Sequence, residues 1–120
     1  MFRLVLSTLV AAALGAVLFL VPAWGGSTGL TGEVGPGYTV EVKKGGKDLK
    51  TIKAGTYKIK VEDKATIHNF HLIGPGLNKK TGVSFKGDVT WTIKLKPGRY
   101  TYQCDPHHLS GMQGHFKVTK

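Results

Sequence analysis

The chain has 120 residues, a formal net charge of +10 at pH 7 and one cysteine. This length leaves room for one domain of moderate size and excludes a second. A single cysteine excludes an internal disulfide bond. The basic balance favours acidic proteins or anionic membrane surfaces as partners, although lysines that only solvate the outer faces of strands would produce the same composition.

An apolar leader opens the chain. In residues 1–25, Arg3 supplies a positive charge near the start. An almost unbroken apolar run then extends to Val21, and small residues follow around Ala23. This order predicts a cleaved export signal, and a retained membrane-anchor helix is the alternative because the run approaches the length of a spanning helix. We therefore expect a location outside the cytoplasm, with membrane association if the leader is kept. An exported chain without a nucleic-acid module is not expected to bind nucleic acid.

Residues 26–37 are rich in Gly, Ser, Thr and Pro and predict a flexible linker. From Tyr38 to Lys120 the sequence alternates with period two, which predicts an all-β domain over residues 38–120. The clearest alternating runs are residues 38–43, 57–62 and 89–96. Pro97 and Gly98 follow the last of these runs and predict a hairpin. Short strands at this spacing predict a two-sheet antiparallel sandwich.

The same alternation predicts where several side chains point. If the segment around His68 is extended, this histidine faces the core, whereas Asn69 and His71 face the opposite way. Cys104 lies on the inner face of the strand that precedes it. His115 should point outward from the last strand.

One short loop contains three soft or borderline donors. Cys104 and His107 are three residues apart, and Met112 follows five residues later. Thiolate, imidazole and thioether suit copper and suit calcium or magnesium poorly. Two histidines and a cysteine with a long axial methionine form the arrangement of electron-transfer copper sites. The second histidine must come from elsewhere, and the inward-facing His68 is the best candidate.

The combined pattern resembles the cupredoxins, most closely their plastocyanin-like branch. It consists of His68-Asn69 after a mid-domain strand, the spacing Cys104-x-x-His107-x-x-x-x-Met112, and a closing strand over residues 114–118. The resemblance covers residues 38–120 and implies a Greek-key β-sandwich that holds one copper ion, cycling between Cu(I) and Cu(II), in a blue type 1 site.

The resemblance also implies a role for each position. His68 and His107 would donate imidazole nitrogens, Cys104 a thiolate and Met112 a weak axial thioether. Asn69 would join the two ligand loops without binding copper, through a contact that its backbone can supply.

Three further histidines lie close to this pattern. We interpret His71 as a surface or edge residue, His108 as an exposed loop residue because only His107 has the family spacing, and His115 as a surface residue.

Four protein ligands leave no open position for a substrate, so we expect an electron carrier and not an enzyme. The resemblance implies that electrons pass through the edge of His107. We expect a monomer whose partner is a redox protein with an acidic surface. The alternatives are copper delivery or buffering outside the cytoplasm, which the extra histidines mildly favour, and a metal that only stabilises the fold.

Overall fold

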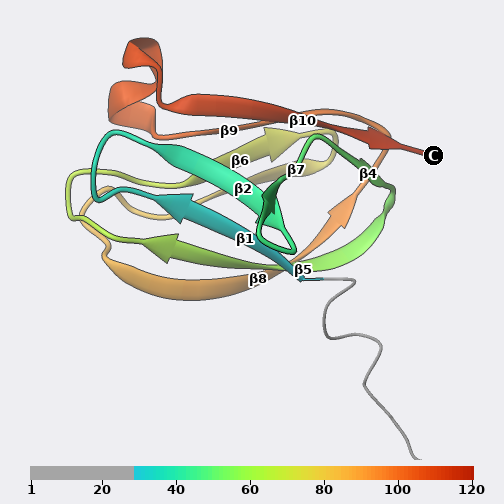
Figure 1. The fold of residues 1–120 in the computed structure, drawn as a ribbon, viewed down its shortest axis with the longest axis horizontal. Helices are drawn as coiled ribbons and strands as arrows, with labels where there is room; N and C mark the ends of the chain where they lie inside the picture. Colours follow the sequence, from blue (N-terminus) through green and yellow to red (C-terminus); the bar gives the residue numbers. More distant parts are fainter. Residues whose placement is uncertain (1–28) are drawn as a thin grey trace, which may run out of the picture.

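The computed structural model describes residues 29–120, so the expectation of an export signal or anchor helix over residues 1–25 lies outside the described residues. Two five-stranded sheets pack face to face (Figure 1). The first has the strand order β3-β2-β1-β5-β8 and the second the order β4-β10-β9-β6-β7. The predicted two-sheet β-sandwich is confirmed. Within residues 29–120, no helix has the length and apolar character needed to cross a membrane.

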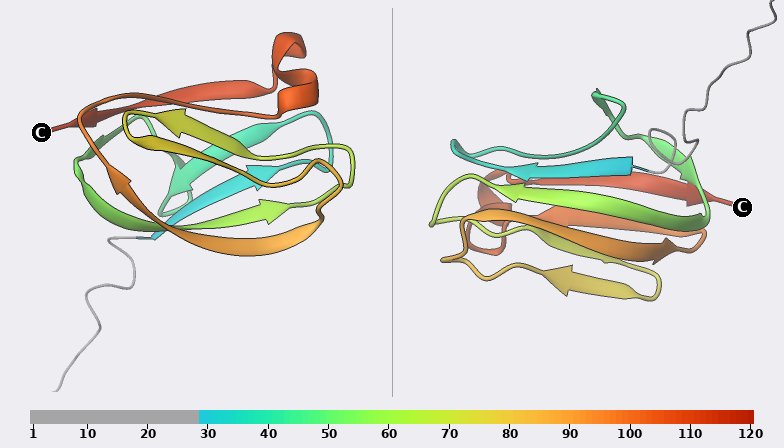
Figure 2. Two further views of the ribbon diagram at one scale, coloured as in Figure 1. Left: turned by 180° about the vertical axis from the view of Figure 1, so that it is seen from behind. Right: turned by 90° about the horizontal axis from the view of Figure 1, so that it is seen from below.

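The elements follow one another with short connections. In chain order they are β1 (Gly29–Val34), β2 (Val40–Lys44), β3 (Lys47–Asp48), β4 (Thr51–Lys53), β5 (Gly55–Asp63), β6 (His71–Gly74), β7 (Leu77–Lys80), β8 (Gly87–Leu95), β9 (Gly98–Gln103), the 3-10 helix η1 (Asp105–Ser110) and β10 (Gln113–Thr119). Figures 1 and 2 show η1 at the same end of the sandwich as the loop that joins β1 to β2.

The alternation seen in the sequence becomes the core of the sandwich. Ile59 and Val61 of β5 and Ile93 of β8 are buried, while the lysines between them are exposed. The facing sheet contributes Tyr100, whose ring stacks on that of Phe116 with 5.4 Å between centroids. Burial of these side chains removes apolar surface from water, which is the main source of stability in such a domain.

β1 corrects the predicted domain boundary. It pairs antiparallel with β2 and parallel with β5, so the expected linker over residues 26–37 is wrong for residues 29–34. Leu30 and Val34 are buried, and Gly32 takes the inward-facing place between them. A Cβ at Gly32 would lie 2.6 Å from Cζ of Phe70. Gly32 leaves room for the phenyl ring of Phe70. Because glycine has no side chain, the alternation of buried residues in β1 was not visible in the sequence.

The predicted hairpin around Pro97 and Gly98 is also wrong. β8 pairs with β5 in the first sheet, whereas β9 pairs with β6 and β10 in the second. The turn therefore carries the chain from one sheet to the other. The hydroxyl of Tyr100 holds this crossing, because it accepts a hydrogen bond from the Lys96 amide at 3.0 Å and donates one to the Pro75 carbonyl at 2.7 Å.

The sandwich is not purely antiparallel as expected. Each sheet contains one parallel pair, β1 with β5 and β4 with β10. Neither pair joins consecutive strands, so their direction follows from how the chain crosses between the sheets and not from a local turn.

Candidate metal centre

His68 is fully buried at the end of the sandwich, so the predicted inward direction is confirmed, although residues 68–70 lie before β6 and are not extended strand. It follows a turn at residues 66–67, and β6 begins only at His71. The loop after β1 packs against its ring, because a Cβ at Gly35 would lie 3.1 Å from Cδ2 of His68. Gly35 has φ +78°, a conformation that glycine adopts without strain. His68 is thus positioned by the turn that precedes it and by the loop after β1 that packs on its ring.

Cys104 directly follows β9 and begins the loop that contains the other donors. Pro106 stands in the first turn of η1, where a missing amide hydrogen costs nothing. The His107 amide donates to the Cys104 carbonyl at 3.1 Å, and the Cys104 amide donates to the Met112 carbonyl at 3.0 Å. Gly111, with φ +104°, ends η1 in a left-handed conformation. These bonds curl the segment until Met112 lies beside Cys104.

Three donor atoms converge at this end of the sandwich. Nδ1 of His68 lies 3.2 Å from Nδ1 of His107, and Sγ of Cys104 lies 3.6 Å and 3.4 Å from these two nitrogens. Nitrogen and sulfur lone pairs this close repel one another unless a proton or a cation lies between them. Their chemistry suits copper. The side chains of Cys104 and Met112 are buried. The four residues are therefore positioned as a single copper site.

Asn69 joins the two segments that carry the donors. The Asp105 amide donates to Oδ1 of Asn69 at 2.7 Å, and Nδ2 of Asn69 donates to Oδ2 of Asp105 at 2.9 Å. The contact thus comes from the side chain, although the sequence also allowed a backbone contact. Asn69 is also buried instead of facing away, because residues 68–70 precede β6 and do not follow strand alternation.

The Asp105 carboxylate collects several hydrogen bonds. Burial acts to raise its pKa, but hydrogen bonds from Gln103, His71 and Asn69 outweigh this and lower the pKa to about 2. Nδ1 of His71 lies 2.8 Å from Oδ1 of Asp105, and Nε2 lies 2.6 Å from Oδ1 of Asn78. The sequence pattern gave no sign of this network.

The three extra histidines lie outside the group of converging donors. The expected surface or edge position of His71 is wrong, because it begins β6, an inner strand that pairs with both β7 and β9, and its side chain is only 14% exposed. His108 is half-buried and not exposed as predicted, because its Nδ1 lies 2.8 Å from the Asp105 carbonyl oxygen. His115 is exposed, and its outward direction from β10 is confirmed.

Asp63 is a buried carboxyl that the sequence did not single out. It is 2% exposed, and burial raises its pKa, while the amide of Ala65 and nearby His68 lower it in part. Oδ2 of Asp63 and Nε2 of His68 are the two buried side-chain atoms in residues 29–120 without a hydrogen-bond partner. The carboxyl therefore lies close enough to His68 for the imidazole to act on its pKa, although the two side chains are not hydrogen-bonded to each other.

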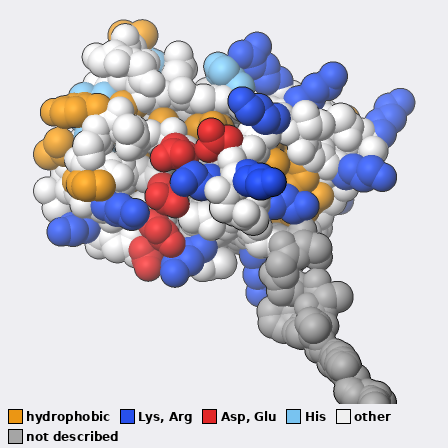
Figure 3. Space-filling view, viewed as in Figure 1, with side chains coloured by type: hydrophobic (Ala, Val, Ile, Leu, Met, Phe, Trp, Pro, Cys, Tyr) orange, Lys and Arg blue, Asp and Glu red, His pale blue; other side chains and the backbone are white. Residues whose placement is uncertain are grey.

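Apolar side chains surround this end of the molecule. The Tyr38 ring stands edge-on to His68 and His107, with centroid distances of 5.3 Å and 4.9 Å, and is 64% exposed. Leu109 is 91% exposed and Ile67 is also on the surface. Figure 3 shows hydrophobic side chains gathered at this end. The half-buried His107 thus lies within an apolar surface.

Comparison with known proteins agrees with the fold and the donor set. The model of the copper-binding proteins of the plastocyanin/azurin family matches residues 34–119. The chain therefore belongs to the plastocyanin/azurin family of copper-binding proteins, the cupredoxins. This match includes both plastocyanin and azurin, so it does not single out the plastocyanin-like branch that the sequence resembles.

Solved cupredoxin structures share the fold. Reduced rusticyanin is 21% identical, with a TM-score of 0.55 over 76% of this chain and 78% of its own. Rusticyanin from Thiobacillus ferrooxidans is 22% identical, with a TM-score of 0.54 over 76% of each chain. Dithionite-reduced auracyanin from the photosynthetic bacterium Roseiflexus castenholzii is 20% identical, with a TM-score of 0.53 over 80% of this chain and all (100%) of its own. At these identities the likeness establishes the fold.

Proposed function

We propose that this protein carries single electrons between redox partners outside the cytoplasm through a type 1 copper site. The observation that carries the proposal is the convergence of Nδ1 of His68, Nδ1 of His107 and Sγ of Cys104, which lie within 4.8 Å of one another. Copper bound by such donors supplies a one-electron couple. The location outside the cytoplasm is inferred from the apolar leader over residues 1–25.

In this proposal each donor has a distinct role. His68 and His107 would donate imidazole nitrogens, Cys104 a thiolate and Met112 a weak thioether, and copper held by this donor set would supply a one-electron couple. Because the protein fills these positions, a substrate has no place to bind, which argues against catalysis at the metal. The sandwich and the Asn69–Asp105 hydrogen bonds fix the donors before metal arrives, so a change of oxidation state requires little rearrangement.

The electron would leave through the edge of His107. This side chain is half-buried, whereas His68 and Cys104 are fully buried. Exposed Tyr38 and Leu109 lie on the same end and offer a partner apolar contact area. A partner that covers this surface would approach His107 more closely than any other donor.

Copper delivery or buffering is the rival function. The extra histidines favoured it in the sequence, but both ring nitrogens of His71 lie within hydrogen-bond distance of acceptors, and Nδ1 of His108 is similarly engaged. These contacts leave fewer free imidazole nitrogens for a second, weaker copper site. Electron transfer is therefore the stronger proposal.

The test combines a spectrum with two transfer assays. We expect the Cu(II)-loaded protein to show intense visible absorption from thiolate-to-copper charge transfer and a reversible reduction potential. It should exchange electrons quickly with a cytochrome and retain its copper when mixed with a metal-free copper protein. Ready copper transfer together with slow electron exchange would instead support delivery.

A further inference from the structure

The two sheets differ sharply in charge. The strands of the β3-β2-β1-β5-β8 sheet contain six acidic and six basic residues, so their formal charges cancel. The strands of the β4-β10-β9-β6-β7 sheet contain five basic residues and no acidic one. The excess positive charge of the strands therefore lies entirely on the second sheet.

Four of the six carboxylates on the first sheet lie in ion pairs with lysines. Lys64 lies 3.4 Å from Glu33, and Lys60 lies 3.7 Å from both Glu62 and Asp88. Figure 3 shows acidic and basic side chains interleaved on one face. None of the ion pairs within residues 29–120 includes Arg99 or Lys117 of the second sheet.

Arg99 and Lys117 face each other directly across the antiparallel pair of β9 and β10. Like charges in opposite positions destabilise a sheet, and a carboxylate in either place would remove the repulsion. Both side chains are exposed on the outer face, so neither is needed for packing of the core. A cost to stability that the fold itself does not offset is consistent with a role in binding.

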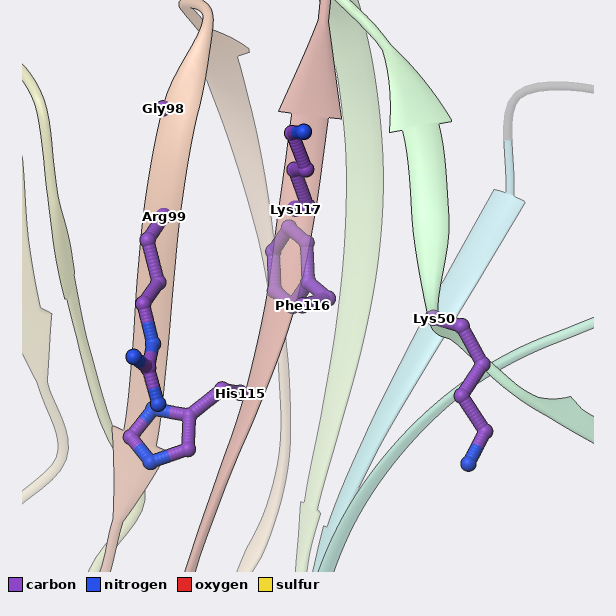
Figure 4. Close-up of a pocket in the computed structure, with 6 residues that line it drawn as sticks. All are labelled: Lys50, Gly98, Arg99, His115, Phe116 and Lys117. Atoms are coloured by element: carbon purple, nitrogen blue, oxygen red, sulfur yellow. The ribbon is translucent and has the colours of Figure 1, made fainter.

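These two cations border a surface hollow, which Figure 4 shows in close-up. The hollow measures about 360 Å³. Lys50, Arg99, His115 and Lys117 contribute its polar lining, and Phe116 and Gly98 complete it. Arg99 lies five strand positions before Cys104, roughly 16 Å along β9, so the hollow is separate from the metal centre.

We propose that this hollow is a docking site for an acidic segment of a partner protein, whose carboxylates bind between Arg99 and Lys117. A guanidinium binds a carboxylate through two parallel hydrogen bonds, and lysine adds a mobile point charge. A concave surface bordered by exposed cations fits a polypeptide segment better than it fits a flat layer of lipid headgroups. This docking proposal depends on the proposed function in one respect, because it takes the partner to be the redox protein that exchanges electrons with the copper site.

A matched pair of double variants tests the site. Arg99→Glu/Lys117→Glu reverses the two cations at the hollow, and Lys58→Glu/Lys94→Glu makes the same change in net charge on exposed positions of the other sheet. The probe is a labelled decaglutamate peptide, titrated by fluorescence anisotropy into the copper-loaded full chain. We expect the first variant to bind at least about tenfold more weakly and the second to change less than about threefold.

The result that overturns the proposal is equal weakening in both variants, because net charge alone would then explain binding. A wild-type protein that does not bind the peptide at low salt would overturn it as well. Vesicles of phosphatidylcholine and phosphatidylglycerol at a 3:1 ratio test the membrane alternative. All three proteins share the leader, so a loss of vesicle binding confined to Arg99→Glu/Lys117→Glu, without peptide binding by the wild type, would assign the hollow to a membrane surface instead.

The visible spectrum and reduction potential separate this proposal from the proposed function. Both should be the same in all three proteins, because the substituted side chains lie on outer strand faces. Failure of the electron-carrier function would appear as the absence of a reversible potential in the wild type. Failure of the docking proposal would appear in the peptide titration while the potential stays intact.

Discussion

Asn69 and Asp105 exchange two hydrogen bonds across 36 positions of sequence, and these bonds join the segment of His68 to the loop of Cys104. Asn69→Ala would leave the Asp105 amide without its acceptor. We expect the free energy of unfolding of the metal-free protein to fall by about 1–3 kcal/mol, measured by urea unfolding. Asn78→Ala is the control, since this exposed residue bonds only to His71. An equal loss in both variants would contradict the special role of Asn69.

The low pKa of Asp105, about 2, gives a dependence on pH. A carboxyl whose pKa is lowered by folding stabilises the protein above its unfolded pKa, near 3.9, and this contribution is lost as the pH falls toward 2. Asp105→Asn should therefore lose less stability than the wild type between pH 4 and pH 2. Urea midpoints of the metal-free protein measure the slope. Asp88→Asn removes a surface carboxylate and should change it less.

Asp63 should act in the opposite direction. Burial raises its pKa, so its contribution to stability is fully present below the unfolded pKa and is lost as the pH rises through the folded value. Asp63→Asn keeps a neutral side chain that can still accept the Ala65 hydrogen bond. We expect this variant to be more stable than the wild type at pH 7, with the difference disappearing below pH 4. Thermal unfolding of both metal-free proteins at the two pH values would decide, and a less stable variant at pH 7 would refute the prediction.

The proposed roles of sulfur predict two different phenotypes. Cys104→Ser replaces the soft thiolate, so the protein should lose its intense visible colour and bind Cu(II) only weakly. Met112→Leu removes a long, weak axial bond, so copper should stay bound and coloured while the reduction potential rises. Absorption spectra and voltammetry give both readings. A colourless Met112→Leu protein would show that the thioether is more than an axial ligand.

His107 and His108 are neighbours with different expected roles. His107→Ala removes a converging nitrogen and should disrupt the colour or open the site to solvent. His108→Ala removes a side chain bonded to the Asp105 carbonyl and should leave colour and potential nearly unchanged. The reverse pattern in the spectra would exchange the two assignments.

Much of the fold was predictable because strand periodicity is a local signal. The alternation of Trp91, Ile93 and Leu95 identified a strand that the structure contains. Prediction failed where a distant partner decides the outcome. Gly32 looked like part of a linker because the phenyl ring that fills its place belongs to Phe70, and the turn at Pro97 carries no sign of which sheet follows it.

The donor set was predictable for a related reason. Cys104, His107 and Met112 lie in one loop, where spacing along the chain largely determines spacing in the fold. Their surroundings were not predictable. Burial raises the pKa of Asp63, whereas hydrogen bonds from Gln103, His71 and Asn69 lower that of Asp105, and no short sequence pattern records either environment.

β1 also fixes how the domain is held by anything attached to its start. The strand has six residues and spans roughly 20 Å. Its far end leads into Gly35 beside His68, so β1 begins at the end of the sandwich opposite η1 (Figure 1). A membrane, an electrode or a fused protein joined through the preceding residues would therefore be attached at the end of the domain that lies opposite the donors. The pole that carries Tyr38 and His107 would face outward, free to turn toward successive partners without detaching.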